Sequence, residues 1–213
     1  MQSPEFCRCG IERIGELIIN SPNDEGIAAY FDGCEYLKVA EGTFPGAVSF
    51  KEAGVERIGK LITAPDLVGN AAYFTKCENL KVAEGTFPGA VRFCCSGIEK
   101  IGELVINSPD EDGIAACFCR CNALNIAEGT FPGTVSFNES GITKIGELNI
   151  TAPSEGGMKA EFLGCTLLER APVALLEDTS FLFDAEFRIR AGEMQAIRKS
   201  ACNALQIQPD LEI

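Results

Sequence analysis

Residues 40–46 read Ala-Glu-Gly-Thr-Phe-Pro-Gly, and the same seven residues return at 83–89 and again at 127–133. A second motif, Gly10-Ile11, returns as Gly54-Val55, Gly97-Ile98 and Gly141-Ile142. The period is therefore 43 or 44 residues. Self-similarity at a fixed period of about 20 to 50 residues is the sequence signature of a repeat architecture. The sequence predicts a chain built of stacked copies of one unit.

Each period contains two unequal halves, and each half carries a short pair of residues with strand-like alternation. One set of pairs is Leu17/Ile19, Leu61/Thr63, Leu104/Ile106 and Leu148/Ile150. The other set is Leu37/Val39, Leu80/Val82 and Leu124/Ile126, with Leu168 opening a further half that breaks at Arg170. Successive pairs lie 19 to 24 residues apart. Each half is therefore expected to form one coil of a solenoid, which gives about eight coils in all.

Apolar residues recur at fixed places in the period, as a stacked core requires. These columns are Phe31/Phe74/Phe118/Phe162, Cys34/Cys77/Cys121/Cys165, Phe44/Phe87/Phe131, Phe50/Phe93/Phe137 and Val48/Val91/Val135. A single coil cannot bury its own apolar face, but neighbours stacked on it can. Gly42, Pro45 and Gly46 predict a tight corner of the coil.

Two architectures have coils of this length. A leucine-rich repeat has one short strand per coil on the inner face of an arc, with about 20 to 29 residues per repeat. A parallel β-helix carries two or three strands per coil. The Leu pairs are the only strand signal found in every coil, which favours a mainly β repeat solenoid like a leucine-rich repeat, a right-handed superhelix with short parallel strands. The parallel β-helix remains the alternative.

Two segments also resemble a known family. Residues 29–37, Ala-Tyr-Phe-Asp-Gly-Cys-Glu-Tyr-Leu, and residues 72–80, Ala-Tyr-Phe-Thr-Lys-Cys-Glu-Asn-Leu, are similar to the A-F-x-x-C-x-x-L core of BspA-like leucine-rich repeats. Repeated Ile-Gly pairs and a Pro after the strand add to the resemblance, which covers about residues 10 to 170. The alternating coil lengths depart from that family's more uniform repeat. The resemblance implies a bacterial surface or effector protein that acts by protein binding and adhesion.

Residues 171–213 leave the repeat and predict a C-terminal cap, whereas residues 1–9 are expected to be a lead, in part cloning sequence. Between Phe181 and Arg190 apolar and mostly charged residues alternate, which predicts a strand. Met194, Ile197, Ala201 and Leu205 then recur at helical spacing, and 202–205 echo 121–124. Because the last coil of a solenoid would otherwise expose its core, we expect this strand and helix to cover it.

Composition excludes several classes of partner. The formal net charge is -13, which argues against binding nucleic acid or an anionic membrane. No apolar run approaches the length of about 18 to 20 residues needed to span a bilayer, and no signal peptide is visible. The 11 Cys include the adjacent Cys94 and Cys95. An odd count of this kind is a poor disulfide framework and favours a reducing compartment, such as a cytoplasm or the host cytosol of a secreted effector.

The cysteines and the repeated charged residues are the candidates for a catalytic or metal-binding role. His is absent, which removes the commonest general base. Cys117-x-Cys119-x-Cys121, with Cys94 and Cys95 one coil away, suggests a metal site, but the spacing is unlike the usual C-x2-4-C pairs. Packing is the favoured interpretation, so no metal and no cofactor are expected. Two charged columns, Glu41/Glu84/Glu128 and Arg13/Arg57/Lys100/Lys144, repeat too regularly for an active site and predict solvated faces.

A partner-binding surface is expected where side chains beside the buried strand positions point from the concave face. The candidate residues are Ile18, Tyr36, Lys38, Ile62, Lys81, Val105, Asn107 and Asn149. Ile18, Ile62 and Val105 share one column and would form apolar patches within a polar rim. β-propensity of a part-exposed strand explains them equally well.

The leading hypothesis is a non-enzymatic protein-interaction module. A structural spacer or engineered array is the second, and a carbohydrate-active β-helix enzyme the third, ranked low because clustered acids are absent from the sequence. Surface columns that vary between coils favour a module that recognises a partner: Lys38 and Lys81 become Asn125, and Arg92 replaces Ser49 and Ser136.

Overall fold

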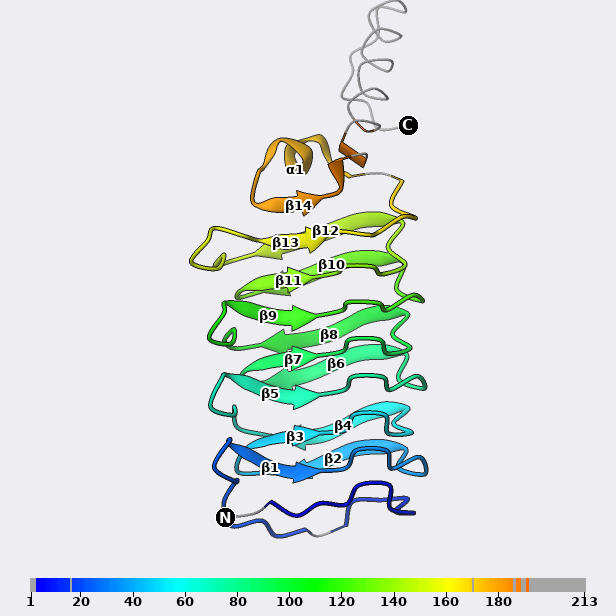
Figure 1. Ribbon diagram of the computed structural model, residues 1–213, viewed down its shortest axis with the longest axis vertical. Helices are drawn as coiled ribbons and strands as arrows, with labels where there is room; N and C mark the ends of the chain where they lie inside the picture. The colour runs from blue at the N-terminus through cyan, green and yellow to red at the C-terminus, as the bar shows by residue number, and fades with distance from the viewer. Residues whose placement is uncertain (1–2, 16, 170, 186, 189–190, 192–213) are drawn as a thin grey trace, which may run out of the picture.

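The computed structural model is one straight column of stacked coils, with the first and the last described residues at opposite ends of the column (Figure 1). It describes residues 3–15, 17–169, 171–185, 187–188 and 191. Residues 1–2, 16, 170, 186, 189–190 and 192–213 lie outside this description. The candidate helix over 194–205 and the echo at 202–205 therefore stay predictions. The mainly β repeat solenoid with short parallel strands is confirmed.

One face of the column is a parallel sheet of eight strands, which take their places in the order of the coils. Its strands are β1 (Ile27–Tyr30), β3 (Ala47–Ser49), β5 (Asn70–Tyr73), β7 (Ala90–Arg92), β9 (Ile114–Cys117), β11 (Thr134–Ser136), β13 (Ala160–Phe162) and β14 (Phe181–Phe183). Every pairing between neighbours in this sheet is parallel. Each coil therefore adds one strand to this face.

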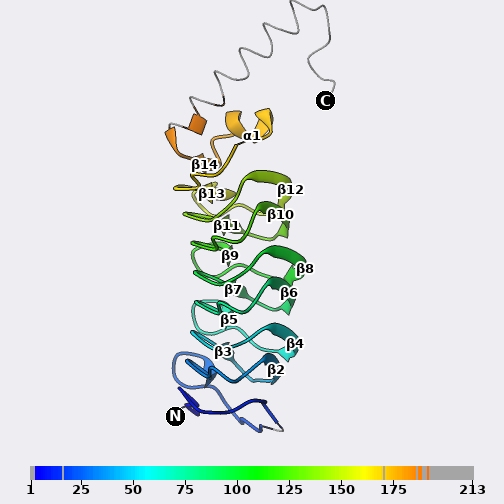
Figure 2. The same cartoon turned by 90° about the vertical axis from the view of Figure 1, so that its right-hand side faces the viewer.

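The opposite face carries a second set of strands, which Figure 2 separates from the first. They are β2 (Val39–Thr43), β4 (Arg57–Ile62), β6 (Val82–Phe87), β8 (Lys100–Ile106), β10 (Ile126–Phe131) and β12 (Lys144–Ile150). They pair in parallel as β2-β4, β6-β8 and β10-β12. From β1 to β12 the chain alternates between the faces, so a coil carries two strands where one was expected. Two per coil is the strand count of a parallel β-helix.

Stacked phenylalanine rings form the centre of the core. The ladder is Phe6, Phe31, Phe50, Phe74, Phe93, Phe118, Phe137, Phe162 and Phe183. Neighbouring ring centroids lie 5.1 to 5.5 Å apart, with interplanar angles of 5° to 11°. That spacing suits offset stacking of aromatic rings. The sequence predicts two separate columns of phenylalanines, one containing Phe31 and the other Phe50. In the structure, residues of the two columns alternate along a single stack of rings.

The remaining apolar columns close the core around this ladder. Phe44, Phe87 and Phe131 meet the ladder edge-on from the opposite corner. Leu37, Leu80 and Leu124 are fully buried at the corner before the second strand of their coil. These Leu residues precede the strand, which begins at Val39, Val82 or Ile126 and continues through the Glu-Gly-Thr segment. The sequence predicts that this strand begins two residues earlier, at the Leu. It also predicts a corner at the Glu-Gly-Thr segment, which in the structure is part of the strand.

Both ends of the ladder are covered in the described part of the chain. At the N-terminal end Phe6 stacks on Phe31, and the amide of Phe6 donates to the carbonyl of Tyr30 at 2.8 Å. At the other end the short helix α1 (Val173–Glu177) precedes β14, and Phe183 stacks on Phe162. The predicted strand over 181–190 is wrong beyond Phe183, because Ala185, Phe187 and Arg188 are helical. Phe187 still reaches the core, tilted against Phe183.

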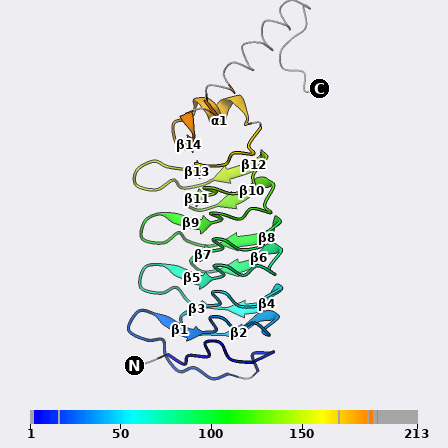
Figure 3. The same ribbon diagram turned by 45° about the vertical axis from the view of Figure 1, so that its right-hand side comes forward.

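Wide loops protrude from one side of the column, at the turns that precede β1, β5, β9 and β13 (Figure 3). Three of these turns are closed by a side chain that caps the strand start, and before β1 Asn23 Oδ1 accepts hydrogen bonds from the amides of Glu25 and Ile27. Asp66 accepts hydrogen bonds from the amides of Val68 and Asn70, and Asp110 accepts the same bonds from Asp112 and Ile114. None of the described helices is long and apolar enough to cross a membrane.

Candidate binding surface

The face formed by β2, β4, β6, β8, β10 and β12 carries most of the residues expected to bind a partner, and it is called the binding face below. All eight candidate residues are exposed. Ile18 is 85% exposed, Ile62 47% and Val105 50%, although each is an aliphatic side chain that normally favours burial. Ile62 lies at the end of β4 and Val105 near the end of β8. The column is straight in all three views, so this face is flat and not concave.

Strand pairing places three of the candidate residues beside threonines, one such pair in each of the three two-stranded sheets of this face. Thr43 is paired with Ile62, Thr86 with Val105, and Thr130 with Asn149. All three threonines are exposed. Each pair therefore sets an exposed threonine beside Ile, Val or Asn, and this combination recurs in three successive double repeats.

Sequence reasoning missed the threonines because each follows a glycine in what reads as a turn. Gly42 has a φ of +125° and adjoins a register shift between Ala40 and Gly42. Such a bulge places one extra residue in the strand and changes which residues face outward. The signal in the sequence is the unbroken repetition of Glu-Gly-Thr, one residue before each buried Phe.

Ion pairs border the binding face at the corner before β4 and β8. Lys38 pairs with Glu56 at 2.9 Å, and Lys81 pairs with Glu99 at 3.4 Å. The third repeat has Asn125 in place of the lysine, and there the carbonyl of Asn125 accepts from Thr143 Oγ1 at 3.2 Å. The border is thus polar throughout, but its charge changes along the column.

Two shallow grooves contain four of the candidate residues. Tyr36 and Lys38 line one of about 640 Å³, together with Glu12, Arg13, Val39, Glu41 and Arg57. Ile62 and Asn107 line the other, of about 430 Å³, together with Gly59, Lys60, Leu61, Thr63, Thr86 and Pro88. The grooves are open to solvent. Side chains of a partner protein can fit into them.

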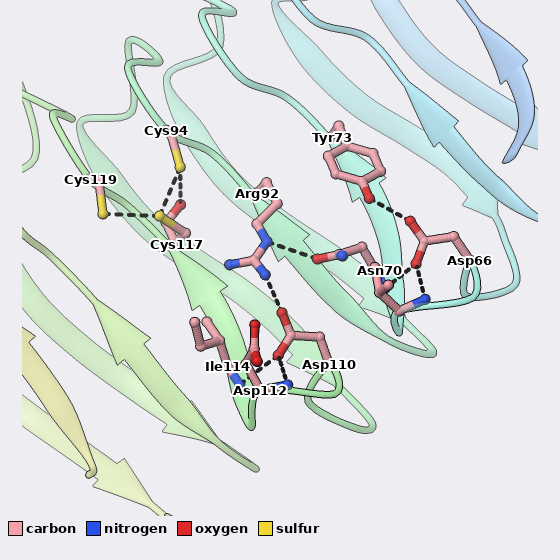
Figure 4. A network of polar contacts seen from close by, with 11 residues as sticks. Asp66, Asn70, Tyr73, Arg92, Cys94, Asp110, Asp112, Ile114, Cys117 and Cys119 are labelled. Carbon is pink, nitrogen blue, oxygen red and sulfur yellow. Dashed lines mark hydrogen bonds and ion pairs between the residues drawn. The ribbon is translucent and has the colours of Figure 1, made fainter. Parts of the chain in front are cut away.

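The eight-stranded sheet on the other side carries polar networks on its outer surface (Figure 4). Arg92 donates to Asn70 Oδ1 at 2.8 Å and forms an ion pair with Asp110, whose side chain is 2% exposed. Tyr73 donates its hydroxyl proton to Asp66. Burial, followed by this bond to the carboxylate, raises the pKa of Tyr73 above its ordinary value. These contacts tie each protruding turn to the neighbouring coil.

Next to this network lies a cluster of three thiols. Cys94 Sγ lies 2.7 Å from Cys117 Sγ, which lies 3.0 Å from Cys119 Sγ, and all three sulfurs fall within 4.8 Å of one another. The hydrogen bonds from Cys117 and Cys94 lower the pKa of the Cys119 thiol, while the bond to Cys119 raises the pKa of Cys117 to about 12.

The repeating cysteine column behaves differently from this cluster. Cys34, Cys77, Cys121 and Cys165 are buried free thiols, as the sequence predicts. Each donates to a backbone carbonyl of the neighbouring coil; for Cys77 this is Phe50 O, at 3.0 Å. Cys121 therefore belongs to the core column in which the sequence placed it, although it also follows Cys117 and Cys119 in the C-x-C-x-C segment.

Comparison of this chain with protein-family models, with curated proteins and with solved structures finds no match.

Proposed function

We propose that this chain is a non-enzymatic protein-interaction module that binds a protein partner through the binding face. The observation that carries the proposal is the row of exposed Ile18, Ile62 and Val105. Large aliphatic side chains aligned on one flat face and bordered by ion pairs match the composition of protein interfaces, in which an apolar centre lies within a polar rim. Two residues of this row, Ile62 in β4 and Val105 in β8, are also held by strand pairing, which lowers the entropy cost of binding.

The resemblance of residues 29–37 and 72–80 to BspA-like leucine-rich repeats supports the same class of function, including a role as a bacterial surface or effector protein. The A-F-x-x-C-x-x-L residues are accounted for by packing, since Phe31, Cys34 and Leu37 are buried core residues. The proposed function therefore depends on the exposed row and not on this motif.

Variation along the row favours recognition of a partner over a purely structural spacer. Equivalent positions are Ile18, Ile62, Val105 and Asn149, and the bordering Lys38 and Lys81 give way to Asn125. A spacer needs only uniform coils, whereas a surface matched to one partner needs a defined apolar part and a defined polar part. The row provides both, apolar in the first three double repeats and polar in the fourth.

Affinity capture with two matched variants tests the proposal. The first replaces Ile18, Ile62 and Val105 by Asn, the residue that the chain itself carries at 149. The second replaces three exposed leucines away from the row, Leu67, Leu163 and Leu167, by Asn. We expect the first variant to lose a protein that the unaltered chain captures from cell extract, and the second to retain it. Equal capture by both variants would overturn the proposal.

A further inference from the structure

Three cysteine side chains from two neighbouring coils converge on the outer surface of the eight-stranded sheet. Cys117 is the last residue of β9, Cys119 follows two residues later, and Cys94 lies two residues after β7. The strands β7 and β9 are hydrogen-bonded neighbours, and the amide of Cys95 donates to the carbonyl of Cys119 at 2.8 Å. The backbone on both sides of the cluster is therefore fixed by sheet pairing.

The cluster is a local departure from the repeat. Cys94 stands where the equivalent coils have Lys51 and Asn138. Cys117 stands in the column of Tyr30, Tyr73 and Glu161, and Cys119 in that of Asp32, Thr75 and Leu163. The core column, by contrast, repeats Cys at every equivalent position. Packing of the solenoid therefore accounts for the core cysteines but leaves these three without a structural role.

We propose that Cys94, Cys117 and Cys119 bind one thiophilic metal ion, with Zn²⁺ as the best fit. Two thiolates on one tetrahedral zinc, with Zn–S bonds of about 2.3 Å, lie about 3.8 Å apart. The sulfurs are already grouped within 4.8 Å, and the shortest separations of 2.7 and 3.0 Å need only a small rotation of side chains to open. Soft thiolate ligands select zinc or copper(I) over hard cations.

The surroundings of the cluster allow an ion to enter and hold one ligand in place. Cys94 and Cys119 are partly exposed, whereas Cys117 is buried. Ser136 Oγ lies 3.1 Å from Cys119 Sγ and donates to Glu161 Oε2 at 2.9 Å. Three thiol protons leave to solvent as three Zn–S bonds form, and the exposed side leaves the fourth position to a water molecule or another donor. Partners of this kind around a ligand orient it for metal.

A disulfide between two of these cysteines is the competing interpretation. It would use only two of the three thiols and leave the third without a role, whereas a metal ion uses all three. It also requires an oxidising environment. Metal binding therefore accounts for more of the cluster.

The test uses the intact chain, reduced and handled without oxygen, with Zn²⁺ for stoichiometry and Co²⁺ as a spectroscopic probe. We expect one equivalent of zinc to remain after gel filtration, and Co²⁺ to give sulfur-to-cobalt charge-transfer absorption. Cys94→Ser, Cys117→Ser and Cys119→Ser should each weaken binding about tenfold or more. Cys95→Ser is the matched control, because it adjoins Cys94 but its sulfur lies outside the cluster.

Thermal melting separates lost binding from lost folding. Zinc should raise the Tm of the unaltered chain and of Cys95→Ser, because a ligand that binds only the folded state stabilises it. The three cluster variants should melt without zinc like the unaltered chain and show no rise with zinc. Absence of charge-transfer absorption, equal zinc uptake by the cluster variants, or a disulfide among the three with no zinc uptake after reduction would overturn the proposal.

Discussion

At the scale of single residues, the stacking distance of the coils is fixed by glycines that leave room for a neighbouring backbone. A Cβ at Gly97 would lie 1.9 Å from the carbonyl oxygen of Glu78, and the equivalent Gly54 meets Glu35 in the same way. Gly10 belongs to the same column, yet a Cβ there would have no atom within 4 Å, because this residue lies at the end of the stack. The sequence repeats the glycine, and only the structure distinguishes its role at the two places.

This difference predicts that Gly97→Ala destabilises the protein strongly and that Gly10→Ala does not. The added methyl group at residue 97 must push two coils apart, and forcing extra volume into a packed region costs about 1 to 3 kcal/mol or more. Chemical denaturation of the two variants measures this difference. Equal midpoints for Gly97→Ala and Gly10→Ala would contradict the account of coil spacing.

Buried thiols add a pH dependence at the same scale. Burial raises the pKa of Cys77 to about 12, from an ordinary value of 9.0. The folded chain therefore holds this proton above pH 9 while the unfolded chain releases it, so the contribution to stability is complete below pH 9 and is lost as pH rises towards 12. Each such group contributes a slope of at most about 1.4 kcal/mol per pH unit.

We therefore predict that the stability difference between the unaltered chain and Cys77→Ala changes with pH. The free energy of unfolding of the unaltered chain should fall more steeply between pH 9 and 12 than that of the variant. Urea denaturation at a series of pH values gives both slopes. Parallel curves across this range would show that Cys77 does not hold its proton in the folded state.

At the scale of the strands, the sequence predicts one set well and the other poorly. The Leu pairs at 61, 104 and 148 mark β4, β8 and β12, because there buried and exposed residues alternate over several positions. The strands of the eight-stranded sheet, such as β3 and β7, have only three residues, and buried Ala and Val dominate them. Alternation cannot be recognised over so short a run, so hydrogen bonding between coils was needed to reveal this sheet.

The phenylalanine ladder that lies against this sheet predicts a graded response to truncation of its rings. Phe93→Ala in the middle of the ladder removes a fully buried ring that stacks on both neighbours, and should cost about 3 to 5 kcal/mol. Phe6→Ala at the end removes a partly buried ring with one stacking partner, and should cost less. Thermal melting of both variants tests the order, and an equal loss would argue against a continuous ladder.

At the scale of the whole molecule, the column depends on its ends. Removal of residues after about 175 would uncover Phe162 by deleting Phe181, Phe183 and Phe187, all of which are buried. Each buried large apolar side chain contributes roughly 1.5 to 3 kcal/mol. We predict aggregation or a strongly lowered Tm for this truncation, measured by light scattering and circular dichroism. A soluble monomer with an unchanged melting curve would contradict the capping role.

Only part of the candidate site could be predicted from the sequence. Exposure of Ile18, Ile62 and Val105 follows from alternation beside the buried Leu positions, which single coils already show. The sequence places Cys94 one coil away from Cys117, but the contact between their sulfurs, and the exposure of the threonines, depend on how one coil lies over the next. That register is a property of the assembled column and is absent from any one repeat.

The most direct test of the binding face is site-specific photocrosslinking to the captured partner. A photoreactive phenylalanine analogue at residue 62, in the exposed row, is compared with the same analogue at 163, an exposed position on the opposite side of the column. We predict a crosslinked complex from position 62 and none from position 163. A crosslink from position 163 alone would contradict the central claim that the partner binds to the face formed by β2, β4, β6, β8, β10 and β12.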